Sequence, residues 1–327
     1  MVSHVVSAWG RILGGFQPNL SVEITRECTL RCPGCYAYGD EHLGGGVVLR
    51  ELADFKGQEL ADGMLDLVRR MRPVHLSIVG GEPLVRYREL NDILPKLSAK
   101  GLHVQVVTSA VRPIPESWAA IPRVQVCVSI DGLAPEHDVR RAPATYDRIL
   151  KHIKGQQITV HCTITRQQTR PGYVTEFAEF WNAQPDVNRI WFSLYTPQKG
   201  EDSPEMLRPD DRARVVEELG GLWSRLPKLF DMRPSVLQAY LKPPADPSEC
   251  IFAQTTACYS SDLKKRILPC QFGGNPDCSQ CGCMASAGLD AVGRYKLAAG
   301  LRAGHVYWAS RVVGRGVRRL RGAAADV

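Results

Sequence analysis

The sequence predicts an α/β fold, a partial six-unit (βα)6 barrel of the TIM type. From residue 20 to residue 195, short apolar runs of strand character alternate with amphipathic runs of helix character. Such alternation favours parallel strands with helices outside them. Six units in about 175 residues agree with the roughly 30 residues of one strand-helix-strand unit, whereas a closed eight-unit barrel typically has about 250 residues. We therefore expect an incomplete barrel with a lateral opening.

Each expected element follows from the period of its apolar residues. Short runs rich in β-branched residues, bounded by turn residues, predict strands. These lie at residues 20–25, 75–79, 103–108, 125–130, 159–165 and 189–194. Apolar residues that recur every three or four positions predict helices. These lie at about residues 57–72, 88–100, 145–153 and 173–182, with a shorter one near 115–120.

Composition divides the chain into five segments. They are an N-terminal helix, a barrel core, a helical linker, a cysteine-rich region and a basic tail, at residues 1–19, 20–200, 201–249, 250–292 and 293–327. The N-terminal helix has one apolar stripe, which we expect to pack on the barrel, with a membrane or partner surface as the alternative. Within the linker, a proline opens a helix expected at residues 209–226.

The composition is that of an ordinary globular protein. Of the 327 residues, 44% are hydrophobic and 23% are charged, which excludes disordered and fibrous classes. No run of eighteen apolar residues predicts a transmembrane helix, and the N-terminus lacks the pattern of a secretory signal. Eleven cysteines in a chain without an export signal indicate metal binding rather than disulfides. We therefore expect a cytoplasmic protein.

The net charge of +7 comes from the C-terminal tail. Between residues 291 and 325 there is no acidic residue, which leaves 33 of the 41 basic residues elsewhere, against 34 acidic ones. The tail's basic residues are Arg294, Lys296, Arg302, Arg311, Arg315, Arg318, Arg319 and Arg321. On a helix from Val306, one face would be apolar, formed by Ala309, Val313, Val317 and Leu320. Such a helix suits either the inner face of an anionic membrane or packing on its own domain, while the lack of interleaved aromatic residues argues against nucleic acid.

Three cysteines follow the first expected strand. Cys28, Cys32 and Cys35 are separated by three and two residues, so their thiolates can converge on one object at the strand's carboxyl end. A cubane [4Fe-4S] cluster usually takes four thiolates, and the next ninety residues contain no further cysteine. Three ligands would leave one iron open to a substrate or cosubstrate. A zinc site is the alternative, with His42 as the closest histidine.

These cysteines form a CxxxCxxC motif, which resembles the signature of the radical S-adenosylmethionine (SAM) enzymes. A second segment, Gly80-Gly81-Glu82-Pro83, looks like that family's GGEP motif after the second strand, which binds the amino group of the methionine moiety. On its own, such a segment is often only a turn. The sequence departs from the family in having Gly34, instead of an aromatic residue, before the third cysteine, although Tyr36 could offer a ring from the other side.

Further motifs follow the third and fourth strands. Ser109 offers a hydroxyl for a ribose or carboxylate, and Ser129-Ile130-Asp131-Gly132 resembles the family's SxDG segment. The resemblance implies that Arg141 holds the methionine carboxylate, which suits a planar guanidinium. The alternative is that Arg141 and its neighbour are solvated residues at a helix entry.

The C-terminal region contains six cysteines within thirty-four residues. They are Cys250, Cys258, Cys270, Cys278, Cys281 and Cys283. Four thiolates would close a cubane, and the region resembles the SPASM or twitch extensions that carry auxiliary clusters in one branch of the family. Zinc suits closely spaced thiolates equally well. Cys127 and Cys162 lie inside apolar strands and are expected to be core residues.

The resemblance implies an enzyme that reductively cleaves SAM at a [4Fe-4S] cluster. The resulting 5′-deoxyadenosyl radical would abstract hydrogen from a substrate, either a peptide or a lipid or other small molecule. A low-potential electron donor such as flavodoxin or ferredoxin would be a partner. We assign no catalytic residue beyond the cluster ligands. A non-enzymatic iron-sulfur or zinc-binding protein would explain the cysteines, but not the placement of Gly80 and Asp131 at strand ends.

Overall fold

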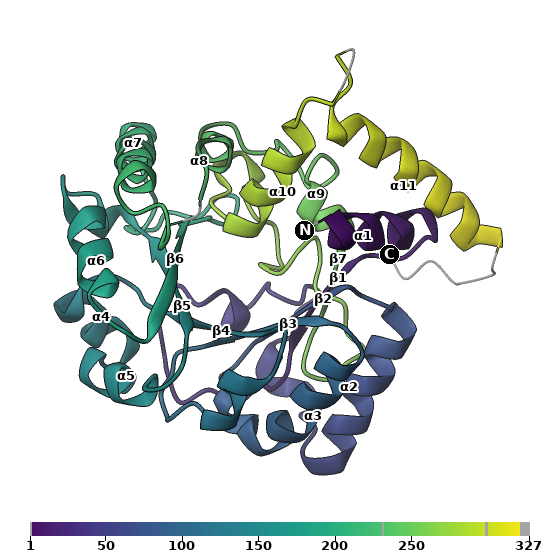
Figure 1. The fold of residues 1–327 in the computed structure, drawn as a ribbon, viewed down its shortest axis with the longest axis horizontal. Helices are drawn as coiled ribbons and strands as arrows, with labels where there is room; N and C mark the ends of the chain where they lie inside the picture. The colour runs from purple at the N-terminus through teal and green to yellow at the C-terminus, as the bar shows by residue number, and fades with distance from the viewer. Residues whose placement is uncertain (1, 231, 298–299, 321–327) are drawn as a thin grey trace.

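The computed structural model describes residues 2–230, 232–297 and 300–320, and within them the chain forms one open, parallel sheet (Figure 1). Its seven strands are arranged in the order β6-β5-β4-β3-β2-β1-β7. Their bounds are β1 Asn19–Glu23, β2 His75–Val79, β3 His103–Thr108, β4 Val124–Ser129, β5 Ile158–Ile164, β6 Val187–Leu194 and β7 Thr256–Tyr259. Because β6 and β7 are not paired with each other, the barrel is partial, as the sequence predicts.

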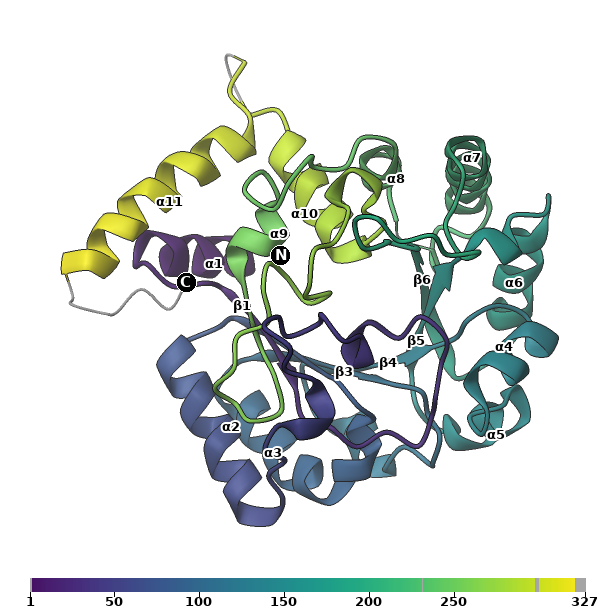
Figure 2. The same cartoon turned by 180° about the vertical axis from the view of Figure 1, so that it is seen from behind.

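Helices cover the outside of the sheet and continue into the C-terminal region. Their bounds are α1 Val2–Leu13, α2 Gly57–Met71, α3 Tyr87–Ala99, α4 Ala134–Arg141, α5 Tyr146–His152, α6 Tyr173–Asn182, α7 Pro209–Arg225, α8 Pro234–Leu241, α9 Ile251–Thr255, α10 Met284–Arg294 and α11 Ala303–Leu320. Seen from behind, the segment that follows β1 crosses in front of the strands (Figure 2). This segment carries the first three cysteines.

The core lies between the strands and the apolar stripes of the helices. Val22 of β1 and Ile78 of β2, which are paired in register, are both fully buried. Leu60, Met64 and Leu67 form the inner stripe of α2 at helical spacing and are equally buried. This packing holds the carboxyl ends of the strands in fixed register, so the loops that leave them have a rigid base.

The six predicted strands are confirmed to within two residues at either end, but β7 was not predicted. It has only four residues, and it pairs in parallel with β1, from Asn19 opposite Thr256 to Val22 opposite Tyr259. A strand so short has no detectable period of its own. The cysteine-rich region is therefore joined to the barrel by a strand of the common sheet.

The two ends of the described chain lie side by side. Helices α1 and α11 pack against each other at one corner of the molecule in both views (Figures 1 and 2). The expectation that the apolar stripe of α1 packs on the barrel is thus corrected, because the main partner of α1 is α11. No described helix is long and apolar enough to cross a membrane. Arg321, counted in the basic tail, lies outside the described residues.

Candidate active site

The first three cysteines lie on the loop that leaves β1. Cys28, Cys32 and Cys35 follow the end of this strand and are all partly buried free thiols at the carboxyl edge of the sheet. Burial raises the pKa of the Cys28 thiol to about 11 and raises the pKa of the other two. Because metal ligation requires thiolates, a bound cationic group must offset this loss of water.

The turn between the second and third cysteines requires glycine. Gly34 has a φ of +65°, and a Cβ there would lie 2.9 Å from Oε2 of Glu205. Glu205 is held by the guanidinium of Arg140, which also donates to the carbonyl oxygen of Pro33 at 2.8 Å. The missing aromatic residue at position 34 thus has a local cause, because this turn has no room for a side chain.

Asp131 holds both arginines of the predicted motif. Its Oδ2 accepts hydrogen bonds from Nε of Arg140 at 2.9 Å and from Nε of Arg141 at 2.7 Å. Burial would raise the pKa of Asp131, but the charges of Arg141 and Arg140 and the hydrogen bond from Arg141 together outweigh it, and the pKa is lowered. The charge of Arg141 also acts on the thiols of Cys32 and Cys35, where it opposes the rise in their pKa. Arg141 is therefore a cation beside the cysteine loop that Asp131 orients, rather than a solvated residue.

Glu82 ties the ends of two strands together. Its carboxylate accepts four hydrogen bonds, from the backbone N–H of Leu84 at 2.8 Å, the hydroxyl of Thr108 at 2.5 Å, and both the N–H and the hydroxyl of Ser109 at 2.8 and 2.5 Å. With four hydrogen bonds to the protein, the carboxylate positions the loops after β2 and β3. Pro83 then begins a short 3-10 turn over Pro83–Arg86.

The two glycines before Glu82 allow backbone to approach backbone. Gly80 and Gly81 have φ values of +74° and +54°. A Cβ on Gly80 would lie 2.2 Å from the Cβ of Glu23, and one on Gly81 would lie 2.4 Å from the carbonyl oxygen of Glu27. The backbone at these two glycines therefore lies directly against the end of β1 and the start of the cysteine loop. Any side chain here would push that loop away.

Ser129 lies at the end of β4, the predicted strand end. It is paired in register with His161 of β5, whose Nε2 lies 2.8 Å from the hydroxyl oxygen of Ser193. Burial lowers the pKa of His161 to about 4, so the ring is neutral at ordinary pH. Its position in the strand interior favours a structural role for this histidine.

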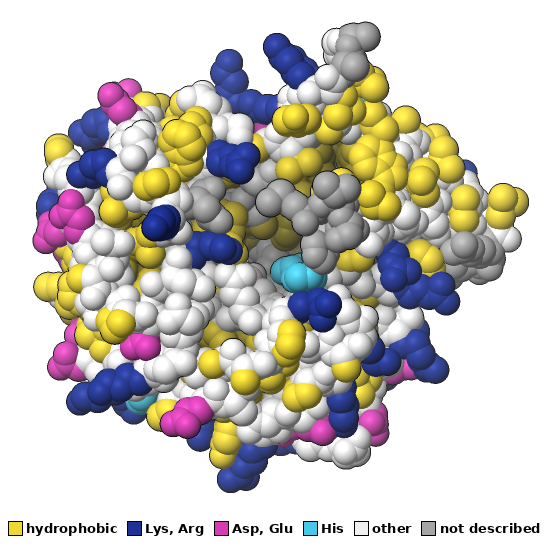
Figure 3. All heavy atoms as spheres, viewed as in Figure 1, with side chains coloured by type: hydrophobic (Ala, Val, Ile, Leu, Met, Phe, Trp, Pro, Cys, Tyr) yellow, Lys and Arg dark blue, Asp and Glu magenta, His cyan; other side chains and the backbone are white. Residues whose placement is uncertain are grey.

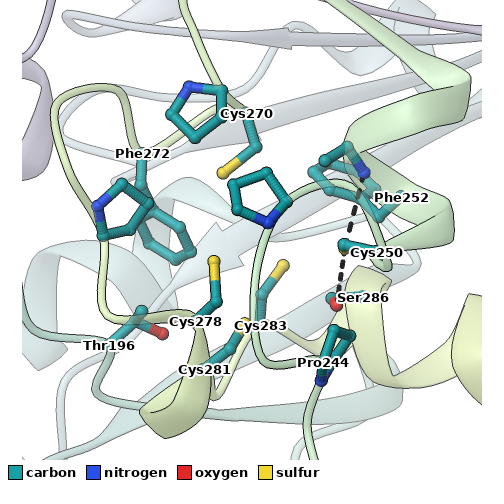
Figure 4. A pocket seen from close by; sticks show the side chains of 14 residues that line it. Thr196, Pro244, Cys250, Phe252, Cys270, Phe272, Cys278, Cys281, Cys283 and Ser286 are labelled. Atoms are coloured by element: carbon teal, nitrogen blue, oxygen red, sulfur yellow. Dashed lines mark hydrogen bonds between the residues drawn. The ribbon is translucent and has the colours of Figure 1, made fainter.

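Five of the six C-terminal cysteines line one cavity (Figure 4). They are Cys250, Cys270, Cys278, Cys281 and Cys283. Figure 4 shows the sulfur atoms of Cys270, Cys278 and Cys283 pointing into the same space. Proline and phenylalanine side chains form much of the remaining wall. Burial raises the pKa of Cys278 to about 11 and that of Cys283 to about 12.

Cys258, the sixth, is not brought to this cavity. It lies on β7, almost fully buried, in a small apolar cluster that includes Leu43, Leu49 and Ile267. Burial raises the pKa of Cys270, and a negative charge on Cys258 would raise it further, so the two thiols are near neighbours. Cys127 and Cys162 are buried in β4 and β5, as expected of core residues.

A sequence model of one superfamily matches part of the chain. Residues 22–165 match the model of the radical SAM superfamily. We call this part of the chain the radical SAM domain. The matched range runs from β1 to the end of β5, and so includes the cysteine loop, the glycines before Glu82 and the arginines beside Asp131.

Curated relatives resemble the same part of the chain. The mycofactocin maturase MftC of Mycobacterium tuberculosis is 27% identical over 140 residues, which cover 42% of this chain and 33% of that protein. The 7-carboxy-7-deazaguanine synthase of Hyperthermus butylicus is 34% identical over 105 residues, 31% of this chain and 39% of the relative. The chain thus spans little more than a third of the length of these relatives.

Solved structures share the fold over a larger part. SuiB of Streptococcus suis bound to S-adenosylmethionine superposes with a TM-score of 0.56 at 17% identity, over 80% of this chain and 62% of that one. Native anSMEcpe with bound AdoMet superposes with a TM-score of 0.55 at 15% identity, over 94% of this chain and 100% of the other. At these identities the likeness shows the partial-barrel fold.

The residues present in the radical SAM domain and in the C-terminal cavity fit iron-sulfur groups. Both places offer thiols with no competing carboxylate or imidazole in the set, and thiolates are the usual ligands of such clusters. Among the residues that the structure describes, no three metal-ligating side chains close around the position of one ion. The thiols instead border wider spaces.

A buried ion pair lies where the radical SAM domain meets the C-terminal region. Nε2 of His42 lies 2.7 Å from Oε1 of Glu23, and the hydroxyl of Ser260 donates to Oε2 of Glu23 at 2.6 Å. The other ring nitrogen of His42 lies 2.9 Å from the carbonyl oxygen of Phe272, so both nitrogens face acceptors, which favours an imidazolium. Burial would lower the pKa of His42, but the hydrogen bond with Glu23, the charge of Glu23 and the Phe272 carbonyl together outweigh that effect, and the pKa is raised.

Sequence reasoning did not find this pair. Glu23 is the last residue of a buried strand, and His42 was considered only as a zinc ligand. A single charged residue at the end of a predicted buried strand is the one signal that could have drawn attention to Glu23, since such a group needs a buried partner. Nothing local identifies that partner.

Proposed function

We propose that this chain is a radical SAM enzyme. Cys28, Cys32 and Cys35 would hold a [4Fe-4S] cluster, which supplies one electron to the sulfonium of SAM and so produces a 5′-deoxyadenosyl radical that abstracts hydrogen from the substrate. The observation that carries the proposal is that three thiols on one loop, the oriented guanidinium of Arg141 and the loop held by Glu82 all lie at one edge of the sheet.

The chain's own residues would bind and orient SAM. Arg141, held by Asp131, is suited to pair with the methionine carboxylate. Gly80 and Gly81 lie where backbone carbonyls could accept hydrogen bonds from the ammonium group, with Glu82 fixing their loop. Ser109 and Ser129, at the ends of β3 and β4, complete the proposed SAM contacts.

We propose that residues 250–292 form an auxiliary cluster region of the SPASM or twitch type. The five thiols of the cavity exceed the four that a cubane needs, so one thiol would not be a cluster ligand. Cys258 would support the site from β7. An electron donor of low potential, such as flavodoxin or ferredoxin, would reduce the cluster of the barrel. The eleven cysteines are all free thiols, which supports a reducing, cytoplasmic location.

A peptide is the proposed substrate. Support comes from SuiB, whose structure bound to the precursor peptide SuiA superposes on 80% of this chain with a TM-score of 0.57, and from the maturase MftC. A substrate presented at a membrane is the second candidate, favoured by exposed apolar side chains near both chain ends.

The decisive experiment measures 5′-deoxyadenosine. Anaerobically reconstituted protein, incubated with SAM and dithionite, is expected to form it. The variant with Cys28, Cys32 and Cys35 all changed to Ala should form none, whereas Cys127→Ala, which removes a thiol from the strand interior, should stay active. If the triple variant forms as much 5′-deoxyadenosine as the wild type, the cluster assignment is wrong. If the wild type holds iron but never cleaves SAM, a non-enzymatic iron-sulfur protein is favoured.

A further inference from the structure

Exposed apolar side chains gather at one corner of the molecule. Ten of the fourteen large hydrophobic residues that are exposed within the described chain lie on α1, at the end of α10, on the segment after it, and on α11. They are Val5, Val6, Leu13, Val292, Tyr295, Leu297, Leu301, Val312, Val313 and Leu320. Figure 3 shows hydrophobic side chains covering much of this corner. We call these residues, with the basic residues among them, the terminal surface.

The buried face of α11 consists of Gly304, Tyr307, Ser310 and Gly314, and other apolar residues of the helix point outward. Gly314 packs so close to α1 that a Cβ on it would lie 2.0 Å from the carbonyl oxygen of Ile12. Nearby, the indole N–H of Trp9 donates to the hydroxyl of Ser310 at 2.9 Å. With Gly314 and Ser310 turned inward, Val312 and Val313 are more than half exposed. The alternative that the apolar stripe packs on its own domain is therefore wrong for these residues.

A short hairpin extends the terminal surface beyond α10. Lys296 and Arg302 form an antiparallel bridge, and the N–H of Leu297 donates to the carbonyl oxygen of Leu301 at 2.8 Å. The side chains of Tyr295, Leu297 and Leu301 are exposed around it. Apolar residues flanked by a lysine and an arginine are thus exposed beside this bridge, between α10 and α11.

The charge of the terminal surface is of one sign. Residues 1–22 and 291–325 contain no aspartate or glutamate. The basic residues that the structure describes there are Arg11, Arg294, Lys296, Arg302, Arg311, Arg315, Arg318 and Arg319. At its rim, the carboxylate of Asp290 pairs with Arg294 at 2.6 Å. At the surface of an anionic membrane, the exposed apolar side chains could contact acyl chains while the basic side chains pair with the anionic headgroups.

We propose that the terminal surface docks on an anionic phospholipid bilayer. A second copy of the chain fits less well, because two surfaces of the same positive sign would face each other. Nucleic acid would leave the apolar residues without a partner. The surface lies near the amino ends of β1 and β7, since α1 leads into β1 and the amide of Gln17 donates to the carbonyl oxygen of Thr256. Docking would therefore hold the protein by the edge of the sheet away from the cysteine loop.

Vesicle flotation tests the proposal with the full-length, anaerobically reconstituted protein. It is expected to float with vesicles that contain phosphatidylglycerol. With vesicles of pure phosphatidylcholine, it should remain in the unbound fraction. Raising the salt from about 0.1 M to about 1 M shortens the Debye length from about 10 Å to about 3 Å, so flotation should fall. Absence of flotation with the anionic vesicles would overturn the proposal.

Paired variants separate the two components of binding. Val312→Glu with Val313→Glu should reduce partitioning about tenfold or more, whereas Leu241→Glu, on an exposed site of α8, should leave it unchanged. Arg315→Gln with Arg319→Gln should reduce binding about tenfold, unlike Arg148→Gln with Lys151→Gln on α5. Circular dichroism verifies that each variant is folded. Wild-type flotation of the folded valine variant would contradict the proposal.

Two further outcomes distinguish other occupants and the proposed function. A dimer in gel filtration that the valine variant dissociates, without vesicle binding, would identify a second copy as the occupant and overturn the proposal. The variant with Cys28, Cys32 and Cys35 changed to Ala should float like the wild type, because docking does not depend on SAM chemistry. Loss of SAM cleavage and loss of flotation are thus independent results.

Discussion

The cysteine loop and the cysteine-lined cavity each gather several thiols, but they do so in different ways. The loop takes three thiols from eight consecutive residues and holds them from outside, through Arg140, Glu205 and the glycines after β2. The cavity takes five thiols from three segments, at the start of α9, before the Pro276 turn and at the start of α10. The loop is a local motif braced by charges, whereas the cavity exists only when distant segments have packed.

The largest expected effect separates the two sites directly. Changing Cys278, Cys281 and Cys283 together to Ala leaves the cavity with two thiols, too few to hold a cubane, and changes none of the loop's. Iron content should fall from about eight to about four atoms per chain, if each site holds a cubane. The remaining cluster should still respond to SAM in its electron paramagnetic resonance spectrum. Cys162→Ala, in the interior of β5, is the control, and complete loss of iron in the triple cavity variant would show that the sites are not independent.

Removing the brace of the loop should have the next largest effect. Arg140→Gln leaves the buried carboxylate of Asp131 with one cation fewer and frees the carbonyl of Pro33. We expect the free energy of unfolding to fall by about 3 kcal/mol, measured by anaerobic chemical denaturation. The matched variant Arg170→Gln breaks an exposed ion pair with Glu176 and should cost less than about 1 kcal/mol. Equal losses would mean that Arg140 is not a brace.

A smaller effect is expected at the turn within the loop. Gly34→Ala should lower the free energy of unfolding by about 1–2 kcal/mol for the positive φ, and further because its Cβ would contact Glu205. Gly46→Ala has a similar φ of +73° and open space around the Cβ, so it measures the backbone contribution alone. The difference between the two variants isolates the contact. No difference would indicate that the loop can shift without cost.

The smallest effect is expected at the Glu23–His42 ion pair, which Ser260 and Phe272 link to the C-terminal region. Because the folded pKa of His42 is raised, its contribution to stability is fully present below the unfolded pKa of about 6.5 and is lost as pH rises through the folded pKa. Wild-type stability should therefore decline towards alkaline pH more than that of His42→Gln. Denaturation midpoints at several pH values measure this. Parallel pH profiles would contradict the assignment of an imidazolium.

Much of the barrel could be predicted because its signals are local. The local pattern of apolar residues around Val22 and Ile78 is enough to predict that both side chains lie in the core, where the structure places them. The spacing of Cys28, Cys32 and Cys35 likewise requires only a strand before it. Strand β7 could not be predicted, because its four residues owe their conformation to pairing with β1.

By itself, the sequence determined the parallel fold, the cysteine loop and the family, since each depends on residues near one another in the chain. Only the tertiary structure decided that five cysteines share a cavity while Cys258 stays outside it, that His42 pairs with Glu23, and that the apolar face of α11 points outward. The physical reason is that these outcomes depend on which distant segments pack together. Neither the period nor the spacing of residues along the chain contains that information.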